Sequence, residues 1–122
     1  MPLGGSSPTT TSARKAGRAD RRTVARPPRR GQVWTVTGGS PRRVLIYSGN
    51  MFNELPDVPY VITMDVTGEP DPLDVELPDG LRVAYTRLDH VPKSLLGDMF
   101  EEVPGELMER INTRLFMVIT TQ

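Results

Sequence analysis

Two segments decide the fold of this chain: Arg30-Gly31-Gln32-Val33-Trp34-Thr35-Val36 and, after a short break, Pro41-Arg42-Arg43-Val44-Leu45-Ile46-Tyr47-Ser48. The first alternates β-favouring residues with period two, and the second contains a continuous apolar run typical of a buried strand. The Gly-Gly-Ser-Pro sequence between them has the composition of a turn. The two segments therefore predict a hairpin whose second strand begins with two arginines, and an arginine fork can bind two phosphate oxygens at once.

Further strands and one clear helix are predicted downstream. Strands are expected at 60–66, 73–77 and 81–86, with a loop at 48–59 and a short turn or helical step at 90–97. Pro104 fits the first position of an amphipathic helix. The apolar stripe of this helix recurs at spacings of three and four, at Leu107, Met108, Ile111, Leu115 and Val118. Because all strands precede the helix, we expect a mainly β protein with helices, in which a compact antiparallel barrel or curved sheet carries the C-terminal helix.

Composition limits what else the chain can be. A length of 122 residues suits one domain. Cysteine is absent and His90 is the only histidine, so neither a disulfide framework nor a thiolate or histidine metal cluster is expected, and no cofactor is predicted. No apolar run reaches the roughly 18 residues of a membrane span, and no signal-peptide core follows the N-terminal arginines. A soluble cytoplasmic protein without membrane contacts is expected.

Charge divides the chain into two parts. Residues 1–30 hold eight basic residues against Asp20, or +7, and because the whole chain carries fifteen residues of each sign, residues 31–122 carry −7. With little apolar area to bury, residues 1–29 are predicted to be a disordered, arginine-rich tail, followed by one domain at 30–122. The tail is interpreted as a basic arm that adds phosphate affinity, as a solvated segment, or as sequence that is not translated because the start codon was assigned too far upstream.

The usual catalytic constellations are missing from the sequence. It contains no nucleophile elbow, no phosphate-binding glycine loop and no metal cluster. The acid pairs Asp71 and Asp74, and Glu101 and Glu102, are interpreted as solvated acids rather than catalytic carboxylates. Cleavage of RNA needs few such devices, because the 2′-hydroxyl of the substrate is the nucleophile. The protein must align the reacting oxygens and stabilise the charge that grows on the phosphoryl oxygens.

The motif order resembles the opening of the MazF/PemK toxin family. Members begin with Arg-Gly-(Asp or Glu)-(Val or Ile)-Trp, then a loop, then Arg-Pro and an apolar strand. In this chain Gln32 replaces the acid, Arg43 replaces the proline, and the loop at 37–41 is shorter than usual. The segment Tyr60-Val61-Ile62-Thr63-Met64-Asp65-Val66-Thr67 is similar to the family's third strand. The resemblance covers roughly residues 30–120 and implies a small SH3-like barrel of the CcdB/MazF type.

The resemblance also implies site residues. Arg42 falls on the arginine that starts the second strand, and Thr67 on the threonine that closes the third, which are the positions the family uses in cleavage. Arg42 is assigned to phosphate binding and transition-state stabilisation, and Thr67 to hydrogen bonding of the phosphate or the attacking hydroxyl. The general base is left unassigned. Taken singly, Arg42 could be a surface arginine beside a turn, and Thr67 could be a β-favouring residue with an ordinary backbone hydrogen bond.

Other side chains have weaker indications. Arg43, Arg82 and Arg87 are candidates for contacts with the RNA backbone, with solubility as the alternative. Trp34 could stack on a base, but a lone tryptophan in a strand is more often part of the core, and that is the interpretation preferred here.

By this resemblance the chain is expected to be the toxin of a toxin–antitoxin system. It would be a metal-independent endoribonuclease that cuts single-stranded RNA to a 2′,3′-cyclic phosphate, acts as a homodimer and is inhibited by a cognate antitoxin. A non-catalytic module on the same fold is the first alternative, either a topoisomerase inhibitor or a copy that sequesters antitoxin. The second alternative is a nucleic-acid-binding protein whose affinity resides in the basic tail.

Overall fold

The computed structural model describes residues 27–120. The predicted disordered tail at 1–29 therefore lies outside the described residues, apart from its last three. The elements in chain order are β1 Gln32–Val36, β2 Arg42–Ile46, α2 Asn50–Asn53, β3 Tyr60–Thr67, β4 Asp74–Glu76, β5 Arg82–Pro92, the 3-10 turn η2 Lys93–Leu95, β6 Leu96–Glu102 and α3 Gly105–Thr120. None of the helices within this range is long and apolar enough to cross a membrane.

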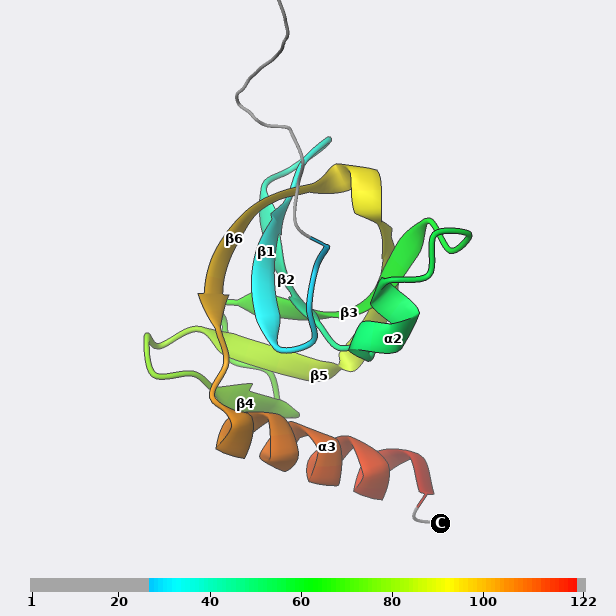
Figure 1. Cartoon of the computed structure of the whole chain (residues 1–122). Coiled ribbons are helices and arrows are strands. Elements are labelled where there is room, and N and C mark those ends of the chain that lie inside the picture. Colours follow the sequence, from blue (N-terminus) through cyan, green and yellow to red (C-terminus); the bar gives the residue numbers. More distant parts are fainter. Residues whose placement is uncertain (1–26, 121–122) are drawn as a thin grey trace, which may run out of the picture.

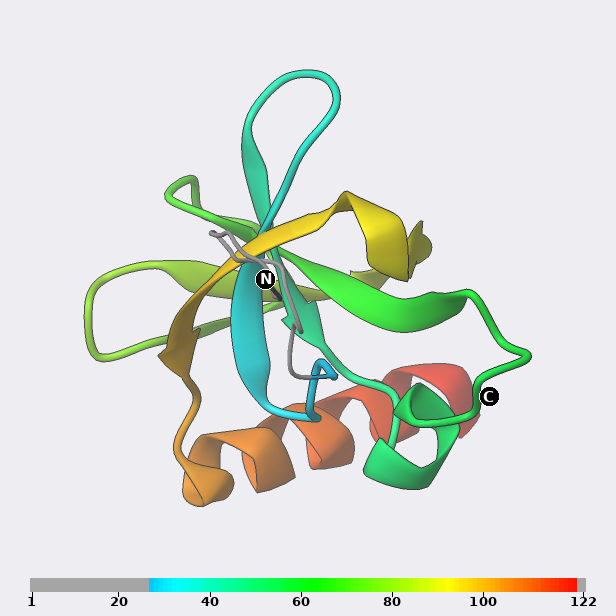
Figure 2. The same ribbon diagram turned by 45° about the horizontal axis from the view of Figure 1, so that its top comes forward.

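The six strands form one antiparallel sheet in the order β4-β5-β3-β2-β1-β6. The sheet is strongly curved, and α3 packs beneath its β4–β5 side (Figure 1). Figure 2 shows the β1–β2 hairpin projecting away from α3. The prediction of a mainly β fold, with a small antiparallel sheet and a C-terminal helix packed on it, is confirmed.

The β1–β2 hairpin forms as its sequence predicts. Val33 pairs with Leu45 and Val36 with Arg42 across the two strands. The turn contains two glycines with positive backbone angles, Gly38 at φ 79° and Gly39 at φ 136°. Residues with a Cβ rarely adopt these angles, so the Gly-Gly sequence is what allows the chain to reverse here. The hairpin thereby places Arg42 at the first position of β2.

A buried core joins the sheet to α3. Met108, Ile111 and Leu115 are the buried residues of the helix, spaced three and four apart as the sequence pattern predicts. Their cluster contains the following buried sheet and loop residues: Val33, Leu45, Met64, Val66, Val75, Leu77, Val83, Tyr85 and Val103. On the other face of the sheet Trp34 packs against Ile46 and Val61. Trp34 is 9% exposed, so the core interpretation of this residue is confirmed.

The structure corrects several predicted element boundaries. The segment 90–97, expected to be a turn or helical step, instead contains the end of β5, the turn η2 and the start of β6. The expected strand at 81–86 is the first half of β5, and the expected loop at 48–59 contains the single turn α2. Val118, expected to be in the buried stripe of α3, is 44% exposed.

Candidate functional site

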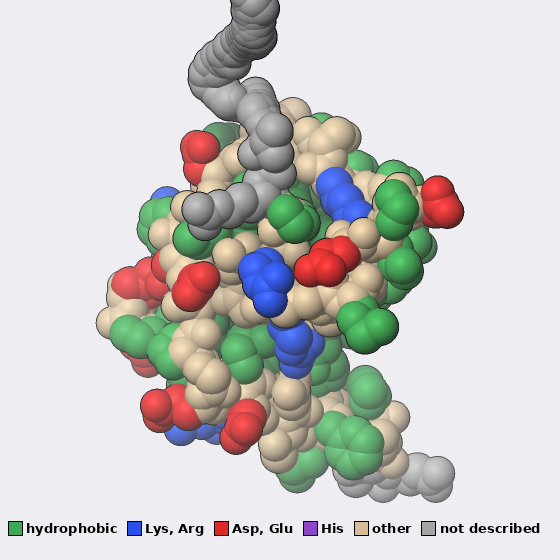
Figure 3. Space-filling model, in the orientation of Figure 1, with side chains coloured by type: hydrophobic (Ala, Val, Ile, Leu, Met, Phe, Trp, Pro, Cys, Tyr) green, Lys and Arg blue, Asp and Glu red, His purple; other side chains and the backbone are tan. Residues whose placement is uncertain are grey.

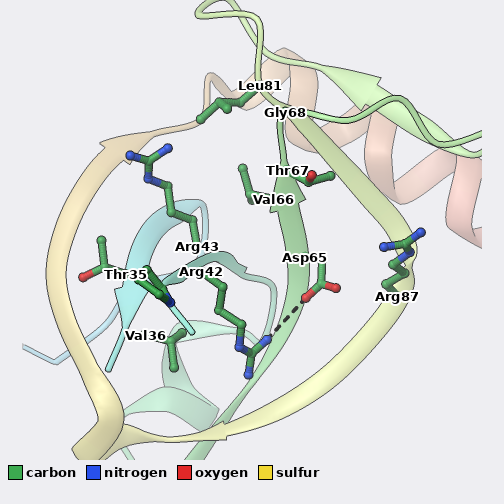
Figure 4. A pocket seen from close by; sticks show the side chains of 11 residues that line it. Thr35, Val36, Arg42, Arg43, Asp65, Val66, Thr67, Gly68, Leu81 and Arg87 are labelled. Atoms are coloured by element: carbon green, nitrogen blue, oxygen red, sulfur yellow. Dashed lines mark hydrogen bonds and ion pairs between the residues drawn. The ribbon is translucent and has the colours of Figure 1, made fainter. Parts of the chain in front are cut away.

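A cavity of about 570 Å³ lies where β2 and β3 meet the loops that follow β1 and β3 (Figure 4). It contains four of the five site residues expected from the sequence. The lining residues are Thr35, Val36, Pro41, Arg42, Arg43, Asp65, Val66, Thr67, Gly68, Leu81 and Arg87. Arg82, the fifth expected residue, does not line this cavity.

The register of β2 and β3 brings Arg42 and Thr67 together. Arg43 lies opposite Val66 in this antiparallel pair, so one step further along the two strands Arg42 faces Thr67. Side chains alternate between the faces of a sheet, and cross-strand partners share a face. Arg42 and Thr67 therefore lie on one face of the sheet, whereas Arg43 lies on the other, and Figure 4 shows the two arginines leaving β2 in different directions.

Arg42 is held by two carboxylates. Its Nη1 donates a hydrogen bond to Asp65 Oδ1 at 3.4 Å, and its Nη2 lies 3.7 Å from Asp89 Oδ2. The side chain of Arg42 is 41% exposed, that of Asp65 36% and that of Asp89 50%. Ion pairs of this exposure contribute less than about 1 kcal/mol. A phosphate that enters the cavity can therefore exchange with either carboxylate at little cost.

The Thr67 hydroxyl is oriented by the turn that follows β3. Its Oγ1 accepts a hydrogen bond from the backbone N–H of Glu69 at 3.1 Å. A threonine hydroxyl that accepts one hydrogen bond keeps its own O–H for donation. The local contact is the ordinary backbone hydrogen bond considered as the alternative for this residue, and it also fixes the donor at the cavity wall.

A bulge in β5 places Arg87 at the cavity. Met64 pairs with Leu88, but the next residue of β3, Asp65, pairs with Ala84, so residues 85–87 loop out between these two pairs. Such a bulge redirects side chains at the edge of a sheet. The Arg87 guanidinium is fixed by Asp71, whose Oδ2 lies 2.9 Å from Nη2.

Arg43 and Arg82 have different surroundings. The Arg43 guanidinium lies 4.0 Å from the centroid of the Phe100 ring on β6, a cation–π contact that keeps it at the cavity wall. Arg82 is paired with Asp74 at 3.2 Å and with Glu76 at 3.6 Å, outside the cavity. Its place in the sheet gives it a structural contact that the sequence did not reveal.

The sequence suggested that the two acid pairs are solvated, and the structure shows that this is wrong for three of the four side chains. The side chains of Asp71 and Asp74 are 12% and 13% exposed, and both pair with arginines of β5. Burial and then the neighbouring Asp79 raise the pKa of Glu101 to about 7, against the opposing effect of Arg43. The other member of its pair, Glu102, is exposed as expected. Within residues 27–120 no three His, Cys, Asp or Glu side chains are grouped so that they could hold a metal ion.

Asp65 and Asp89 are the site residues that sequence reasoning missed. One signal for Asp65 was present, because it precedes Thr67 by two positions in a strand and must share its face. Asp89 was not identifiable, since its contact with Arg42 depends on the extension of β5 and on the bulge in it.

Comparison with known proteins identifies the fold and its relatives. No protein-family model and no curated protein sequence matches the chain. Among solved structures, an endoribonuclease in complex with its cognate antitoxin from a mycobacterial species superposes with a TM-score of 0.68 at 27% identity, covering 78% of this chain and 95% of that one. An endoribonuclease from a mycobacterial species superposes with a TM-score of 0.66 at 26% identity, covering 77% of this chain and 92% of that one. MazF in a MazE–MazF complex from Deinococcus radiodurans shares the fold, with a TM-score of 0.67 at 18% identity over 80% and 100% of the two chains.

The likeness to these two endoribonucleases, on the fold that the MazF toxins also have, supports membership of the MazF/PemK family. In this MazF-like protein the two positions that the sequence resemblance singled out, Arg42 and Thr67, line one cavity. The loop between β1 and β2, which the sequence resemblance predicted to be short, has five residues.

Proposed function

We propose that this MazF-like protein is the toxin of a toxin–antitoxin pair and cleaves single-stranded RNA in the cytoplasm without a metal ion. The observation that carries the proposal is the placement of Arg42 opposite Thr67 at a cavity that also contains Arg43 and Arg87. Three guanidinium groups and a hydroxyl donor around one cavity suit a phosphodiester. The two solved structures above 25% identity, both named endoribonucleases, support the same activity.

The chemistry requires little more than these groups. The 2′-oxygen of the substrate loses its proton and bonds to phosphorus, the bond from phosphorus to the 5′-oxygen breaks, and the 5′-oxygen takes up a proton. The products are a 2′,3′-cyclic phosphate and a 5′-hydroxyl. Arg42 donates two hydrogen bonds to the non-bridging oxygens as their charge grows, and the Thr67 hydroxyl donates to the same phosphate or orients the 2′-hydroxyl.

A cognate antitoxin and a second copy of the chain are the proposed partners. One structural relative is described as bound to its cognate antitoxin, and others as MazE–MazF complexes. Arg42 and Arg87 already bind carboxylates of their own chain, Asp65 and Asp71. An extended acidic segment of the antitoxin can replace either carboxylate at these two arginines. Such a segment would compete directly with RNA.

The same carboxylates favour one alternative function. Arg42 and Arg87 are both neutralised within the chain, and residues 31–122 carry a net charge of −7. A surface with this balance suits a protein partner better than a polyanion. A non-catalytic module that sequesters antitoxin or inhibits a topoisomerase is therefore the second candidate. Binding of nucleic acid through the basic tail concerns residues outside the described range and stays a prediction.

The test is cleavage of a defined RNA in excess EDTA, with the product ends mapped. We compare the wild type with Arg42→Ala and Thr67→Ala, and with Arg110→Ala, an exposed arginine of α3 that does not line the cavity. Loss of one transition-state donor lowers such rates by about 100-fold or more. Cuts with cyclic phosphate ends that both cavity variants abolish and Arg110→Ala retains support the proposal. A wild type that binds antitoxin but leaves RNA intact supports the non-catalytic module instead.

A further inference from the structure

Arg43 differs from the other two arginines of the cavity in its contacts. Arg42 and Arg87 are each paired with carboxylates of their own chain. Among residues 27–120, the side chain of Arg43 has no ion pair and donates no hydrogen bond, and its guanidinium lies 4.0 Å from the centroid of the Phe100 ring. The ring covers one face of the planar guanidinium and leaves open the edge that carries the N–H groups. Within this part of the chain, the donors of Arg43 are therefore available to a ligand.

A bulge in β6 directs Phe100 toward this guanidinium. Val33 of β1 pairs with Glu101, but the next residue, Trp34, pairs with Met99, so Phe100 is the extra residue between the two pairs. The extra residue of a bulge leaves the regular alternation of the strand, and its side chain points in a new direction. The ring thus reaches an arginine of β2 across the intervening strand β1. The contact fixes the guanidinium before a ligand binds, which lowers the entropy cost of binding.

Arg43 and Arg42 cannot bind the same phosphate. Their Cα atoms are about 3.8 Å apart, and successive side chains of a strand point to opposite faces. Figure 4 shows Arg42 extending toward Asp65, and Arg43 extending toward the part of the cavity that Leu81 lines. Because Arg42 is assigned to the scissile phosphate, the donors of Arg43 are left for another group of the same RNA.

The surroundings of Arg43 favour a neutral group over a second phosphate. Burial and then Asp79 raise the pKa of Glu101, and Arg43 lowers it, so these charged groups lie close enough to interact. Figure 3 shows acidic side chains along the left edge of the molecule, where the end of β6 and the β4–β5 loop lie. These acids repel a phosphate but not an uncharged nucleobase. The adjoining lining residues Val66 and Leu81 are apolar, which suits the flat face of a base.

We propose that Arg43, stacked on Phe100, binds the base of a nucleotide next to the scissile phosphate and selects guanine or cytosine. The inference rests on the proposed function and adds a sequence preference to the same site. Two parallel N–H groups of an arginine match a base edge with two adjacent acceptors. In a single strand guanine offers O6 and N7, and cytosine offers O2 and N3. Adenine and uracil have no such pair, because a donor lies next to each acceptor on their polar edges.

The first test maps the sequences at which the full-length protein cuts a long RNA of mixed sequence in EDTA. For the wild type we expect guanine or cytosine at one position beside the cut, with roughly 5-fold to 150-fold discrimination against adenine and uracil. The base found at that position distinguishes guanine from cytosine. Arg43→Lys keeps the charge but loses the two parallel donors, so the preference should disappear at that position alone. Arg110→Ala, at an exposed arginine of α3, should keep it.

Phe100→Leu tests the stacking contact. Without the ring the guanidinium is no longer fixed, so discrimination at the same position should fall. Met99→Leu is the matched control, because Met99 is the neighbouring residue on β6 and is also 45% exposed. Circular dichroism checks that each variant is folded. A preference that Arg43→Lys retains overturns the inference, and so does a loss in Arg43→Ala that is equal for all sequences, since a phosphate contact weakens binding uniformly.

A second measurement separates the base contact from the nuclease. An RNA pool of random sequence with 2′-fluorine in place of every 2′-hydroxyl has no internal nucleophile, but it keeps the base edges. Binding selection with the wild type should enrich guanine or cytosine at one position, and Arg43→Lys should abolish this enrichment. Enrichment by a protein that leaves natural RNA intact overturns the nuclease and supports the base contact. Absence of enrichment overturns the base contact alone when the protein still cuts RNA, and overturns both when it does not.

Discussion

Arg42 and Asp65 form an ion pair inside the cavity, with 3.4 Å between Nη1 and Oδ1. The arginine assigned to phosphate binding is thus already in contact with an anion of its own chain. Both side chains are more than a third exposed, so the pair is weak and exchangeable. Asp65 consequently has two opposite effects on an RNA ligand, since it orients Arg42 and also repels the phosphate.

Asp65→Asn is predicted to tighten RNA binding. A unit charge about 4 Å from a phosphate costs about 1 kcal/mol in water, which corresponds to roughly a 5-fold change in affinity. The amide keeps the size of the side chain and can still accept a hydrogen bond from Arg42. Fluorescence anisotropy with an RNA that carries a 2′-deoxy linkage at the cleavage site measures affinity without cleavage.

The control is Asp57→Asn, an exposed acid in the loop before β3 that does not line the cavity. The gain from Asp65→Asn should shrink as salt rises from about 0.05 M to 0.5 M, because exposed charges are screened. Weaker RNA binding by Asp65→Asn at low salt would contradict the prediction. It would show that the orientation of Arg42 by Asp65 matters more than the repulsion between Asp65 and the phosphate.

Glu101 predicts a pH-dependent contribution to stability. Its pKa is raised from 4.5 to about 7 in the folded protein, chiefly by burial and then by Asp79. Between these two values the unfolded chain is ionised while the folded chain keeps the proton, so stability falls as pH rises through this window. Above pH 7 the carboxylate of Glu101 is charged in the folded and in the unfolded chain, so the full cost of burying its charge lowers the free energy of unfolding. Glu101→Gln should therefore raise Tm by about 4 °C at pH 8 and change it little at pH 4.

Glu102→Gln is the matched control, since Glu102 is the exposed neighbour on the same strand. Thermal unfolding followed by circular dichroism at both pH values gives the comparison. An equal effect of Glu101→Gln at pH 4 and pH 8 would mean that ionisation of Glu101 is not the cause.

The elements that local pattern specifies were predictable from the sequence. The β1–β2 hairpin has turn glycines and alternating strands, and the core stripe of α3 has its helical spacing, so both formed where expected. β6 has no such signal. Its central residues Asp98, Met99 and Phe100 are all exposed, and the strand exists because β1 offers it an edge to pair with. Pairing between segments so distant in sequence is not encoded in a local pattern.

The candidate site was predictable only where its residues belong to a local motif. Arg42 and Thr67 were found through their motif positions, and the register of β2 and β3 makes them neighbours. The contact of Asp89 with Arg42 and the position of Arg87 depend on a bulge in β5 that the sequence does not mark. Arg82 looked equivalent to Arg87 in the sequence, but Asp74 and Glu76 on β4 hold it away from the cavity.

Ile111 is predicted to be essential for the attachment of α3. It is fully buried in the cluster between helix and sheet, so Ile111→Ala removes apolar contacts and leaves a void. Substitutions of this kind cost about 2–5 kcal/mol. Leu55→Ala removes a similar volume from a side chain that is 47% exposed and should cost less than about 1 kcal/mol. Urea unfolding measures both free energies, and similar costs for the two variants would show that Ile111 does not attach α3 to the sheet.

Gly97 is predicted to tolerate no side chain, because β1 passes too close to it. A Cβ on Gly97 would lie 2.7 Å from Thr35 Oγ1 and 3.1 Å from Thr37 Cγ2. The Thr35 hydroxyl cannot move away freely, since its oxygen accepts a hydrogen bond from the backbone N–H of Asp98 at 2.8 Å. Gly97→Ala should therefore destabilise the protein by about 1–3 kcal/mol. Because Thr35 lines the cavity, cleavage of RNA should also decrease.

Gly49→Ala is the control for this substitution, since a Cβ there meets nothing within 4 Å. Urea unfolding of both variants gives the free energies. Combining Gly97→Ala with Thr35→Ala removes the closest contact, so the double variant should lose less stability than the sum of the two single changes. Additive losses would show that the hydroxyl of Thr35 is not what excludes a side chain at position 97, and would locate the conflict at Thr37, the residue directly after β1.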